Sequence, residues 1–446
     1  MKEPLGVIGA GWVGLVTAAC FADLGHEVVV RDVVPERIAE LEAGRVPIFE
    51  PGLPELLAAN RERIRYTLDM ADIYERARIA FVCVDTPPTH SGDADLSRVW
   101  RVVEELADAR ERMVLVMKST VPVGTGAQVR KRLDRVGLAH VGYVSNPEFL
   151  AEGSGIHDFM KPDRVVIGSF TAEDGDAVGS LFTFIGAALV RCDVASAEMI
   201  KMASNAFLAT RISFINEIAN VCEVTGADVE AVARGVGLDH RLGPHFLRAG
   251  IGYGGSCFPK DISALKQLAA NSGYHFQLLS AVIEVNELQK RRVVGKLGKH
   301  LGSLQGRTVT LLGLAFKPKT NDMREAPSLV LASRLIAEGA TVRGWDPIAL
   351  EEARHMLAGI EFFEDLQAAL EGADAAVIVT EWDELSGLLT PEVRESMRHP
   401  LLVDGRNMLD PVEARAAGFV YESIGRAAHG LDALPETEEP ETKLHQ

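Results

Sequence analysis

One cysteine in a glycine-rich segment is the residue of this chain best suited to covalent chemistry. Cys257 lies within residues 252–261, Gly-Tyr-Gly-Gly-Ser-Cys-Phe-Pro-Lys-Asp. The glycines predict that the backbone comes close to a ligand, and a helix is expected to begin just after Cys257. The helix N-terminus and the nearby Lys260 would lower the thiol pKa and favour the thiolate, with Asp261 as a candidate base. The alternative is a tight turn that holds a buried, inert cysteine.

A lysine and an asparagine form a second candidate group. Lys201 and Asn205 are four residues apart in a predicted helix, so their side chains leave the same face. An ammonium and an amide aimed at one point would stabilise an alkoxide or a tetrahedral oxyanion. The alternative is a solvated lysine on a polar helix face.

Taken together, the two groups suggest chemistry beyond the removal of one hydride. If Cys257 adds to an aldehyde, the resulting thiohemiacetal can lose a second hydride to a nicotinamide cofactor and become a thioester. Water then releases a carboxylic acid, a step that needs a base. The available carboxylates are Asp261, Glu148 and Glu152.

A cofactor site is predicted near the start of the chain. Residues 9–14, Gly-Ala-Gly-Trp-Val-Gly, lie between a predicted strand and a predicted helix, and Asp32 ends the next strand. Gly9 would permit the turn, Gly11 would let the backbone approach a pyrophosphate, and Gly14 would allow close helix packing. Asp32 would bond the ribose hydroxyls and favours NAD over NADP, although the arginine before it leaves that preference open. The alternative is a glycine-rich turn without a ligand.

The elements that would position these groups form two α/β domains. Short apolar runs alternate with helical patterns in residues 4–194 and again from residue 307, which predicts two Rossmann-like, doubly wound parallel sheets. Two long helices, 197–225 and 274–301, are predicted between them as a helical spine. The predicted domains are 1–196, 197–302 and 303–428, with 429–446 as a disordered acidic tail. The predicted strands are 4–9, 27–32, 79–84, 113–120, 141–145, 163–169 and 188–194, then 307–316, 341–345, 375–380, 401–403 and 419–422.

Composition and charge limit the partners. The 446 residues are 47% hydrophobic and 24% charged, as in a globular protein with more than one core. The net charge of -17 argues against nucleic acid and anionic membranes as partners. Glycines and Asp23 interrupt the apolar run 5–25, so it is interpreted as neither a signal peptide nor a membrane anchor. The five scattered cysteines contain no C-x-x-C pair, which predicts a cytoplasmic protein without a metal site; all but Cys257 are expected in the core.

Several sequence blocks resemble one family in the family's own order. The chain resembles the UDP-glucose/GDP-mannose dehydrogenase family over residues 1 to about 428. The matching blocks are residues 9–14, Lys118-Ser119-Thr120-Val121-Pro122, residues 146–153 (Asn-Pro-Glu-Phe-Leu-Ala-Glu-Gly), the helix with Lys201 and Asn205, residues 252–261, residues 316–320 (Phe-Lys-Pro-Lys-Thr) and Asp404-Gly405-Arg406.

This resemblance implies an activity and a role for each matching residue. The activity is oxidation of UDP-glucose to UDP-glucuronate with two NAD, in a homodimer formed through the spine. The implied catalytic residues are Cys257, Lys201, Asn205, Asp261, Thr120 and Glu148. The implied cofactor-binding residues are Gly9, Gly11, Trp12, Val13, Gly14, Asp32, Thr86, Pro87, Thr120, Glu152, Lys260 and Arg324. The implied UDP-sugar-binding residues are Phe149, Leu150, Glu152, Lys201, Asn205, Tyr253, Gly254, Cys257, Phe316, Lys317 and Arg406, with Arg241 reaching a neighbouring subunit.

Three alternatives remain open at this stage. The same chemistry could act on GDP-mannose or UDP-N-acetylmannosamine, because sugar selection depends on the shape of a pocket. A two-electron hydroxy-acid dehydrogenase could share the cofactor domain and the lysine and asparagine pair. A non-catalytic nucleotide-sugar sensor could retain both binding domains.

Overall fold

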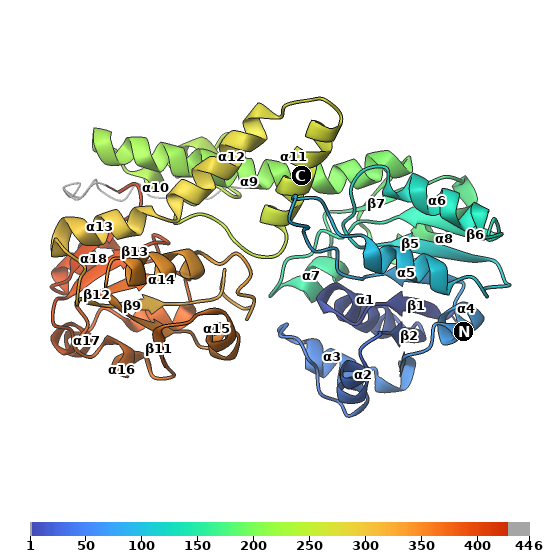
Figure 1. Ribbon diagram of the computed structural model, residues 1–446, viewed down its shortest axis with the longest axis horizontal. Helices are drawn as coiled ribbons and strands as arrows, with labels where there is room; N and C mark the ends of the chain where they lie inside the picture. Colours follow the sequence, from blue (N-terminus) through green and yellow to red (C-terminus); the bar gives the residue numbers. More distant parts are fainter. Residues whose placement is uncertain (1, 427–446) are drawn as a thin grey trace, which may run out of the picture.

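Two α/β domains lie side by side beneath one long helix in the computed structural model, which describes residues 2–426 (Figure 1). The predicted fold class is therefore confirmed, whereas the predicted tail 429–446 lies outside the described residues. Within residues 2–426, every helix is too short or too polar to span a bilayer.

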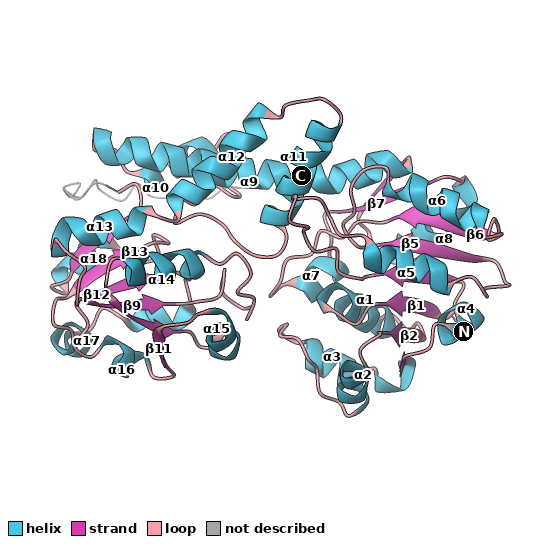
Figure 2. Cartoon of the chain, in the orientation of Figure 1, coloured by secondary structure: helices cyan, strands magenta, loops and turns pink. Residues whose placement is uncertain are grey.

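The first sheet has eight strands in the order β3-β2-β1-β4-β5-β6-β7-β8. Apolar residues of β1 alternate between two hydrophobic clusters, Val7 in one and Ile8 in the other, because helices cover both faces of the sheet (Figure 2). The strands are β1 Leu5–Ile8, β2 Val28–Arg31, β3 Ile64–Thr67, β4 Ile79–Val82, β5 Met113–Met117, β6 Val141–Ser145, β7 Arg164–Ser169 and β8 Ala188–Cys192. The helices are α1 Trp12–Asp23, α2 Pro35–Glu42, α3 Leu53–Ala59, α4 Ala71–Arg76, α5 Ser97–Glu105, α6 Thr125–Arg135, α7 Gly155–Met160 and α8 Ala172–Ser180.

Two features of this sheet differ from the sequence prediction. Strand β3 was not predicted, because it lies at the sheet edge and two of its four residues are not buried, so it lacks a continuous apolar run. Strand β7 runs antiparallel to β6, whereas a wholly parallel sheet was predicted. The reversal places the first residue of β7 at the edge where the parallel strands end.

A helical spine joins the two domains. Helix α9, Val194–Thr225, begins after Asp193, whose side chain accepts a hydrogen bond from the Ser196 amide, and it ends at Gly226 in the left-handed conformation. Its 32 residues make it about 48 Å long, enough to reach both domains. The helices packed with it or following it are α10 Val229–Gly237, α11 Phe258–Asn271, α12 Gln277–Gln289 and α13 Arg292–Leu301.

The predicted helix 274–301 was wrong in one respect, because it is two helices. The chain bends at Lys290 and Arg291, between α12 and α13. Helix α12 packs against α9, whereas α13 packs against α14 and β13 of the second domain. The break therefore allows the chain to pass from the spine to the second sheet.

The second sheet has six parallel strands in the order β11-β10-β9-β12-β13-β14. Its strands are β9 Thr308–Leu312, β10 Thr341–Trp345, β11 Ile360–Phe363, β12 Ala375–Ile378, β13 Leu401–Asp404 and β14 Val420–Ser423. Its helices are α14 Pro327–Ala337, α15 Leu350–Met356, α16 Leu366–Leu370, α17 Pro391–Ser396 and α18 Pro411–Ala416. Strand β11 was not predicted, again because it is a partly exposed edge strand.

Loops from the carboxyl ends of both sheets meet at the domain boundary. Thr320, after β9, donates a hydrogen bond of 2.8 Å to Glu152, after β6. Arg406, after β13, donates to the Gly252 carbonyl at 2.9 Å. Ligands of α/β proteins bind at the carboxyl ends of strands, so this boundary is where a site is expected.

Candidate active site

The turn after β1 has the geometry required to bind a dinucleotide phosphate. Gly9 has φ +106°, and a Cβ on it would lie 2.7 Å from the Cys83 carbonyl oxygen. A Cβ on Gly14 would lie 1.8 Å from the Gly9 carbonyl oxygen. A Cβ on Gly11, in contrast, would meet only an Asp85 oxygen at 4.0 Å, and no side chain caps the first turn of α1. Free amide groups at an open helix N-terminus fit a pyrophosphate, so these residues suit NAD.

Asp32 is buried at the end of β2 and faces this turn. It accepts a hydrogen bond from the Ala10 amide at 2.7 Å and pairs with Arg37 at 3.2 Å. Arg31 pairs with Glu105 at 2.8 Å. The arginine that left the cofactor preference open is therefore already paired with a carboxylate, while Arg37 is the cation beside Asp32. Arg37 was not singled out from the sequence, because nothing in its spacing marks it.

A buried glutamate that was also missed links the cofactor turn to the β6 loop. Glu50 is 3% exposed and accepts hydrogen bonds from the Trp12 indole at 2.8 Å and from the Gly153 and Gly155 amides at 2.7 and 2.8 Å. The Trp12 ring packs on Gly155, where a Cβ would lie 2.6 Å away. Trp12 is thus held by protein contacts, and Val13 beside it is partly exposed.

The other predicted cofactor residues lie along loops at the sheet edge. Thr86 donates a hydrogen bond to the Thr120 carbonyl at 2.8 Å, which joins two of them, and Pro87 is exposed next to Thr86. Glu152 is paired with Arg324 at 3.6 Å. Burial, with the nearby Asp322 charge, raises the pKa of Glu152 to about 7.

Four of the six residues predicted to be catalytic meet in two buried pairs, each with one side chain from α9. The Lys201 ammonium donates to Glu148 at 2.9 Å, and the Asn205 amide donates to Asp261 at 2.6 Å. Lys260 also donates to Asp261, at 2.6 Å. Lys201 and Asn205 lie on the same face of α9, as predicted. Each side chain donates to a carboxylate and is not solvated.

The pair of Lys201 and Glu148 has a defined protonation state. Burial opposes both charges, but the Glu148 carboxylate raises the pKa of Lys201, and Lys201 lowers the pKa of Glu148. At neutral pH Lys201 is therefore an ammonium donor and Glu148 a carboxylate. Lys201 suits stabilisation of an oxyanion, whereas Glu148 can accept a proton but has none to give.

The prediction of a lowered Cys257 pKa is wrong. Burial of the sulfur in the protein raises the pKa of the thiol, and the Glu148 and Asp261 charges raise it further against the opposing effect of Lys201. Lys260, which was expected to favour the thiolate, instead pairs with Asp261. Cys257 directly precedes α11, as predicted, and it is exposed. Of the other cysteines, three are buried and Cys192 is only half-buried.

The glycines before Cys257 allow close contact with other parts of the protein. A Cβ on Gly254 would lie 2.2 Å from the Glu325 carbonyl oxygen, and one on Gly255 would lie 2.7 Å from the Phe316 ring. Glu325 has φ +54°, a strained conformation that directs its carbonyl at the glycine loop. These contacts fix the Cys257 loop against the second domain.

The predicted UDP-sugar residues of the second domain lie at the same boundary. Lys317 is partly buried near the Phe316 ring, and burial lowers the pKa of its ammonium. Arg406 donates to the carbonyls of Val379 at 2.6 Å and Gly252 at 2.9 Å, so part of its guanidinium links the Cys257 loop to the second sheet.

Residues of the first domain and the spine complete this set, with one exception. The Leu150 amide donates to Glu148 at 2.6 Å, and the Phe149 ring lies 5.4 Å from the Lys201 nitrogen. Tyr253 is buried. Arg241 is exposed and paired with Asp239, so the structure does not join it to the others within one chain.

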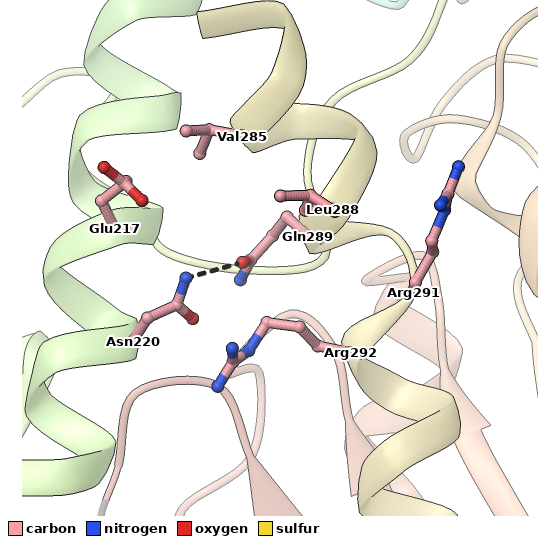
Figure 3. Close-up of a pocket in the computed structure, with 7 residues that line it drawn as sticks. All are labelled: Glu217, Asn220, Val285, Leu288, Gln289, Arg291 and Arg292. Atoms are coloured by element: carbon pink, nitrogen blue, oxygen red, sulfur yellow. Dashed lines mark hydrogen bonds between the residues drawn. The ribbon is translucent and has the colours of Figure 1, made fainter. Parts of the chain in front are cut away.

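A surface hollow lies away from this site, between α9 and α12 (Figure 3). It has a volume of about 370 Å³ and is lined by Glu217, Asn220, Val285, Leu288, Gln289, Arg291 and Arg292. Glu217 is about 18 Å along the α9 axis from Asn205. The hollow contains no nucleophile and belongs to the outer surface of the spine. No cluster of metal-binding side chains exists among residues 2–426.

A dinucleotide-binding turn, with a cysteine, a lysine and two carboxylates at the boundary with a second α/β domain, defines a dehydrogenase class with two binding domains. The chain belongs to the UDP-glucose/GDP-mannose dehydrogenase family. Residues 3–185 match its NAD binding domain, residues 195–288 its central domain and residues 310–411 its UDP binding domain.

Individual relatives match over nearly their full length. The chain is 46% identical to the UDP-glucose 6-dehydrogenase TuaD of Bacillus subtilis (strain 168), covering 96% of this chain and 94% of that protein. It is 46% identical to a UDP-glucose 6-dehydrogenase of Pseudomonas aeruginosa, covering 95% and 98%. A solved UDP-glucose dehydrogenase from Pyrobaculum islandicum is 38% identical with a TM-score of 0.90, covering 96% of this chain and 98% of that one.

Proposed function

We propose that this protein oxidises the 6-hydroxymethyl group of UDP-glucose to the carboxylate of UDP-glucuronate, using NAD. The observation that carries the proposal is the buried group of Lys201, Glu148, Asn205 and Asp261 beside Cys257, between a NAD binding and a UDP binding domain. Two Bacillus subtilis relatives and the Pyrobaculum islandicum structure, all UDP-glucose dehydrogenases by name, support the choice of sugar.

The cofactor supplies the oxidising power: NAD, when bound, accepts one hydride from the sugar carbon in each of two oxidations. Gly11 and the N-terminus of α1 would hold its pyrophosphate, and Asp32 its ribose. Lys317 and Arg406 would hold the UDP phosphates, although Arg406 also donates to the Val379, Gly252 and Phe316 carbonyls and pairs with Glu381 at 3.5 Å. Because the chain is acidic overall, these cations concentrate the positive charge that two anionic ligands need.

The first oxidation produces an aldehyde and releases the hydroxyl proton. A water between the hydroxyl and Glu148 would carry that proton, since Glu148 is ionised at neutral pH. Lys201 remains an ammonium and stabilises the developing alkoxide. Thr120, one of the loop residues at the sheet edge, would help to hold the water.

The second oxidation takes place on Cys257. The sulfur adds to the aldehyde carbon, and its proton ends on the former aldehyde oxygen, which gives a thiohemiacetal. Because the resting thiol has a raised pKa, this addition needs the cationic Lys201 nearby to stabilise the oxygen. Loss of the hydride to NAD and of the hydroxyl proton to water would then give a thioester. Water then attacks the thioester carbon while Asp261 receives a proton, and the carboxylate leaves with the thiol restored.

The test is the yield of NADH per UDP-glucose, with the uronate product measured in parallel. Two NADH and one uronate per sugar are expected. Cys257→Ser should abolish uronate formation yet retain NAD and UDP binding, whereas the control Cys192→Ser should behave as the native chain. Normal uronate production by Cys257→Ser would overturn the covalent step, and one NADH without uronate would indicate a two-electron hydroxy-acid dehydrogenase instead.

The same assay distinguishes the remaining alternatives. A UDP-D-ManNAc dehydrogenase from Pyrococcus horikoshii shares the fold with a TM-score of 0.84 at 26% identity, so UDP-N-acetylmannosamine and GDP-mannose are the sugars to compare. Two NADH on one of these, with none on UDP-glucose, would keep the mechanism and change the substrate. Ligand binding without turnover of any sugar would support a sensor.

We also infer a cytoplasmic homodimer formed through the spine. Phe207, Phe214 and Val221 are 63%, 53% and 54% exposed, and their seven-residue spacing places them on one face of α9. Leu278 and Leu288 are exposed on neighbouring α12, so the apolar surface spans both helices. Exposed apolar patches of this kind typically mark subunit interfaces.

Light scattering on a Phe214→Glu variant tests the interface. Dissociation to monomers is expected, with Phe170→Glu as the control because Phe170 is 48% exposed on the first domain, outside the spine. A native chain that is monomeric, or a Phe214→Glu variant with unchanged mass, would refute the dimer through this face.

A further inference from the structure

Arg164, the first residue of β7, lies on the ring of Phe149, one of the residues that the family resemblance implies to bind the UDP-sugar. Its guanidinium carbon is 3.8 Å from the centroid of the Phe149 ring, a close stacking contact. The arginine is half-buried, and within residues 2–426 no carboxylate forms an ion pair with it. Its side chain makes one hydrogen bond with the part of the chain that the structure describes, a long one of 3.5 Å to the Ser204 hydroxyl on α9. A partly buried cation without a counter-charge calls for an explanation.

The register of the reversed strand explains how these two residues meet. Ser145 pairs with Gly168 across the antiparallel β6 and β7. If this register continues past the end of β6, Phe149 comes opposite Arg164. The Asn146 side-chain amide donates to the Val166 carbonyl at 2.8 Å, and the next residue, Pro147, has no amide hydrogen to continue the backbone ladder. Beyond it, side chains must hold the two segments together.

The contact between Arg164 and Phe149 also links the loop after β6 to helix α9. On the Phe149 ring, the Arg164 guanidinium at 3.8 Å is joined by the Lys201 ammonium at 5.4 Å. Glu148, immediately before the ring, bonds Lys201, and the Leu150 amide after it bonds Glu148. The orientation of the Phe149 ring therefore affects both the Glu148 carboxylate and the turn formed by Glu148, Phe149 and Leu150.

We propose that Arg164 is a positioning residue, which holds the turn of Glu148, Phe149 and Leu150 in place for the sugar nucleotide by stacking on Phe149. It acts through the ring and does not touch the substrate. This inference rests on the proposed function and on the UDP-sugar contact that the family resemblance implies for Phe149. A parallel β7 would have carried Arg164 to the opposite edge of the sheet, so the role depends on the strand reversal.

The test compares Arg164→Met, Arg164→Lys, Phe149→Leu and the double variant Arg164→Met/Phe149→Leu in the full-length protein. Measurements are the KM for UDP-glucose and for NAD, kcat, the Kd of UDP and the melting temperature. Arg164→Met should raise the KM for UDP-glucose and the Kd of UDP about tenfold, the factor of a stacked cation on a partly buried ring. The KM for NAD should stay within about twofold. Arg164→Lys, which keeps the charge but loses the planar stack, should recover part of the loss.

The double variant decides whether Arg164 acts through the ring. If it does, Arg164→Met adds nothing to the effect of Phe149→Leu. Additive effects would mean direct contact with the substrate and would overturn the positioning role. Equal losses for UDP-glucose and NAD with a lower melting temperature would indicate only a structural role. Ser204→Ala should change little, and a defect equal to that of Arg164→Met would assign the effect to the hydrogen bond. No effect of Phe149→Leu would refute the placement of the sugar nucleotide and with it this inference.

Discussion

Substitution of Glu152 by glutamine should stabilise the protein at high pH and not at low pH. Glu152 is 12% exposed at the domain boundary, and its pKa is raised by burial and by Asp322 from 4.5 to about 7. Between these two values the folded chain holds a proton that the unfolded chain has lost. The folded state therefore loses stability as pH rises through this window.

The size of the effect follows from the two pKa values. A difference from 4.5 to about 7 corresponds to about 3 kcal/mol, because each tenfold step costs about 1.4 kcal/mol. Glutamine resembles the protonated acid at every pH. Glu152→Gln should thus exceed the native chain in free energy of unfolding by about 3 kcal/mol at pH 8 and by less than about 1 kcal/mol at pH 5.

Urea unfolding without NAD, followed by tryptophan fluorescence between pH 5 and pH 8, measures this difference. Glu338→Gln is the control, since Glu338 is exposed and should show a flat difference over the same range. A constant gap between Glu152→Gln and the native chain from pH 5 to pH 8 would refute the reasoning. So would a gap that widened toward low pH.

Three further substitutions test the site directly. Lys201→Met should lower kcat about 100- to 1,000-fold with little change in the KM for NAD, because it removes an oxyanion donor; an unchanged kcat in a steady-state assay would contradict that role. Gly254→Ala places a Cβ 2.2 Å from the Glu325 carbonyl oxygen, so it should cost about 1 to 3 kcal/mol in urea unfolding and displace the Cys257 loop, while calorimetry shows native NAD binding. Asp32→Ala should weaken NAD binding at least about tenfold in the same calorimetric titration and leave UDP binding intact, and equal affinities for NAD would remove Asp32 from the cofactor site.

The hydrophobic pattern predicted the central strands and the edge strands β8 and β14 but missed the edge strands β3 and β11. A central strand such as β4 is apolar throughout because helices cover both its faces. The edge strands β3 and β11 have only one neighbour, so polar and apolar residues mix in them. The direction of β7 was also beyond the pattern, because a buried strand has the same composition in either direction.

Local spacing predicted the Lys201 and Asn205 face but not its partners. Glu148 and Asp261 are 53 and 56 positions away from the residues they bond, so only the fold brings them together. The same limit explains the error on Cys257. Its neighbour in sequence, Lys260, suggested a lowered pKa, whereas burial and two carboxylates from other segments determine the observed direction.

The two sheets have the same arrangement of hydrogen bonds around a buried aspartate after their second strand. After β1, Gly9 has φ +106° and the Ala10 amide donates to Asp32 at 2.7 Å. After β9, Gly313 has φ +86° and the Leu314 amide donates to Asp346 at 2.7 Å. The residue two positions after each acid also donates to it, Val34 at 3.0 Å and Ile348 at 2.9 Å.

The two turns differ at the residue after Ala10 and Leu314. This difference determines which ligand each turn can accept. Gly11 is open above the first turn, whereas its counterpart Ala315 is fully buried and its amide donates to Asp346 at 3.1 Å. The Trp382 indole also donates a hydrogen bond to Asp346 at 3.0 Å, so this carboxylate is already occupied by protein groups and is not left for a ribose. A buried acid after the second strand is therefore first a structural anchor for the turn, and it becomes a cofactor ligand only where the turn stays open. Charge for an anionic ligand of the second domain must come from a side chain, and Lys317 follows directly in the same loop.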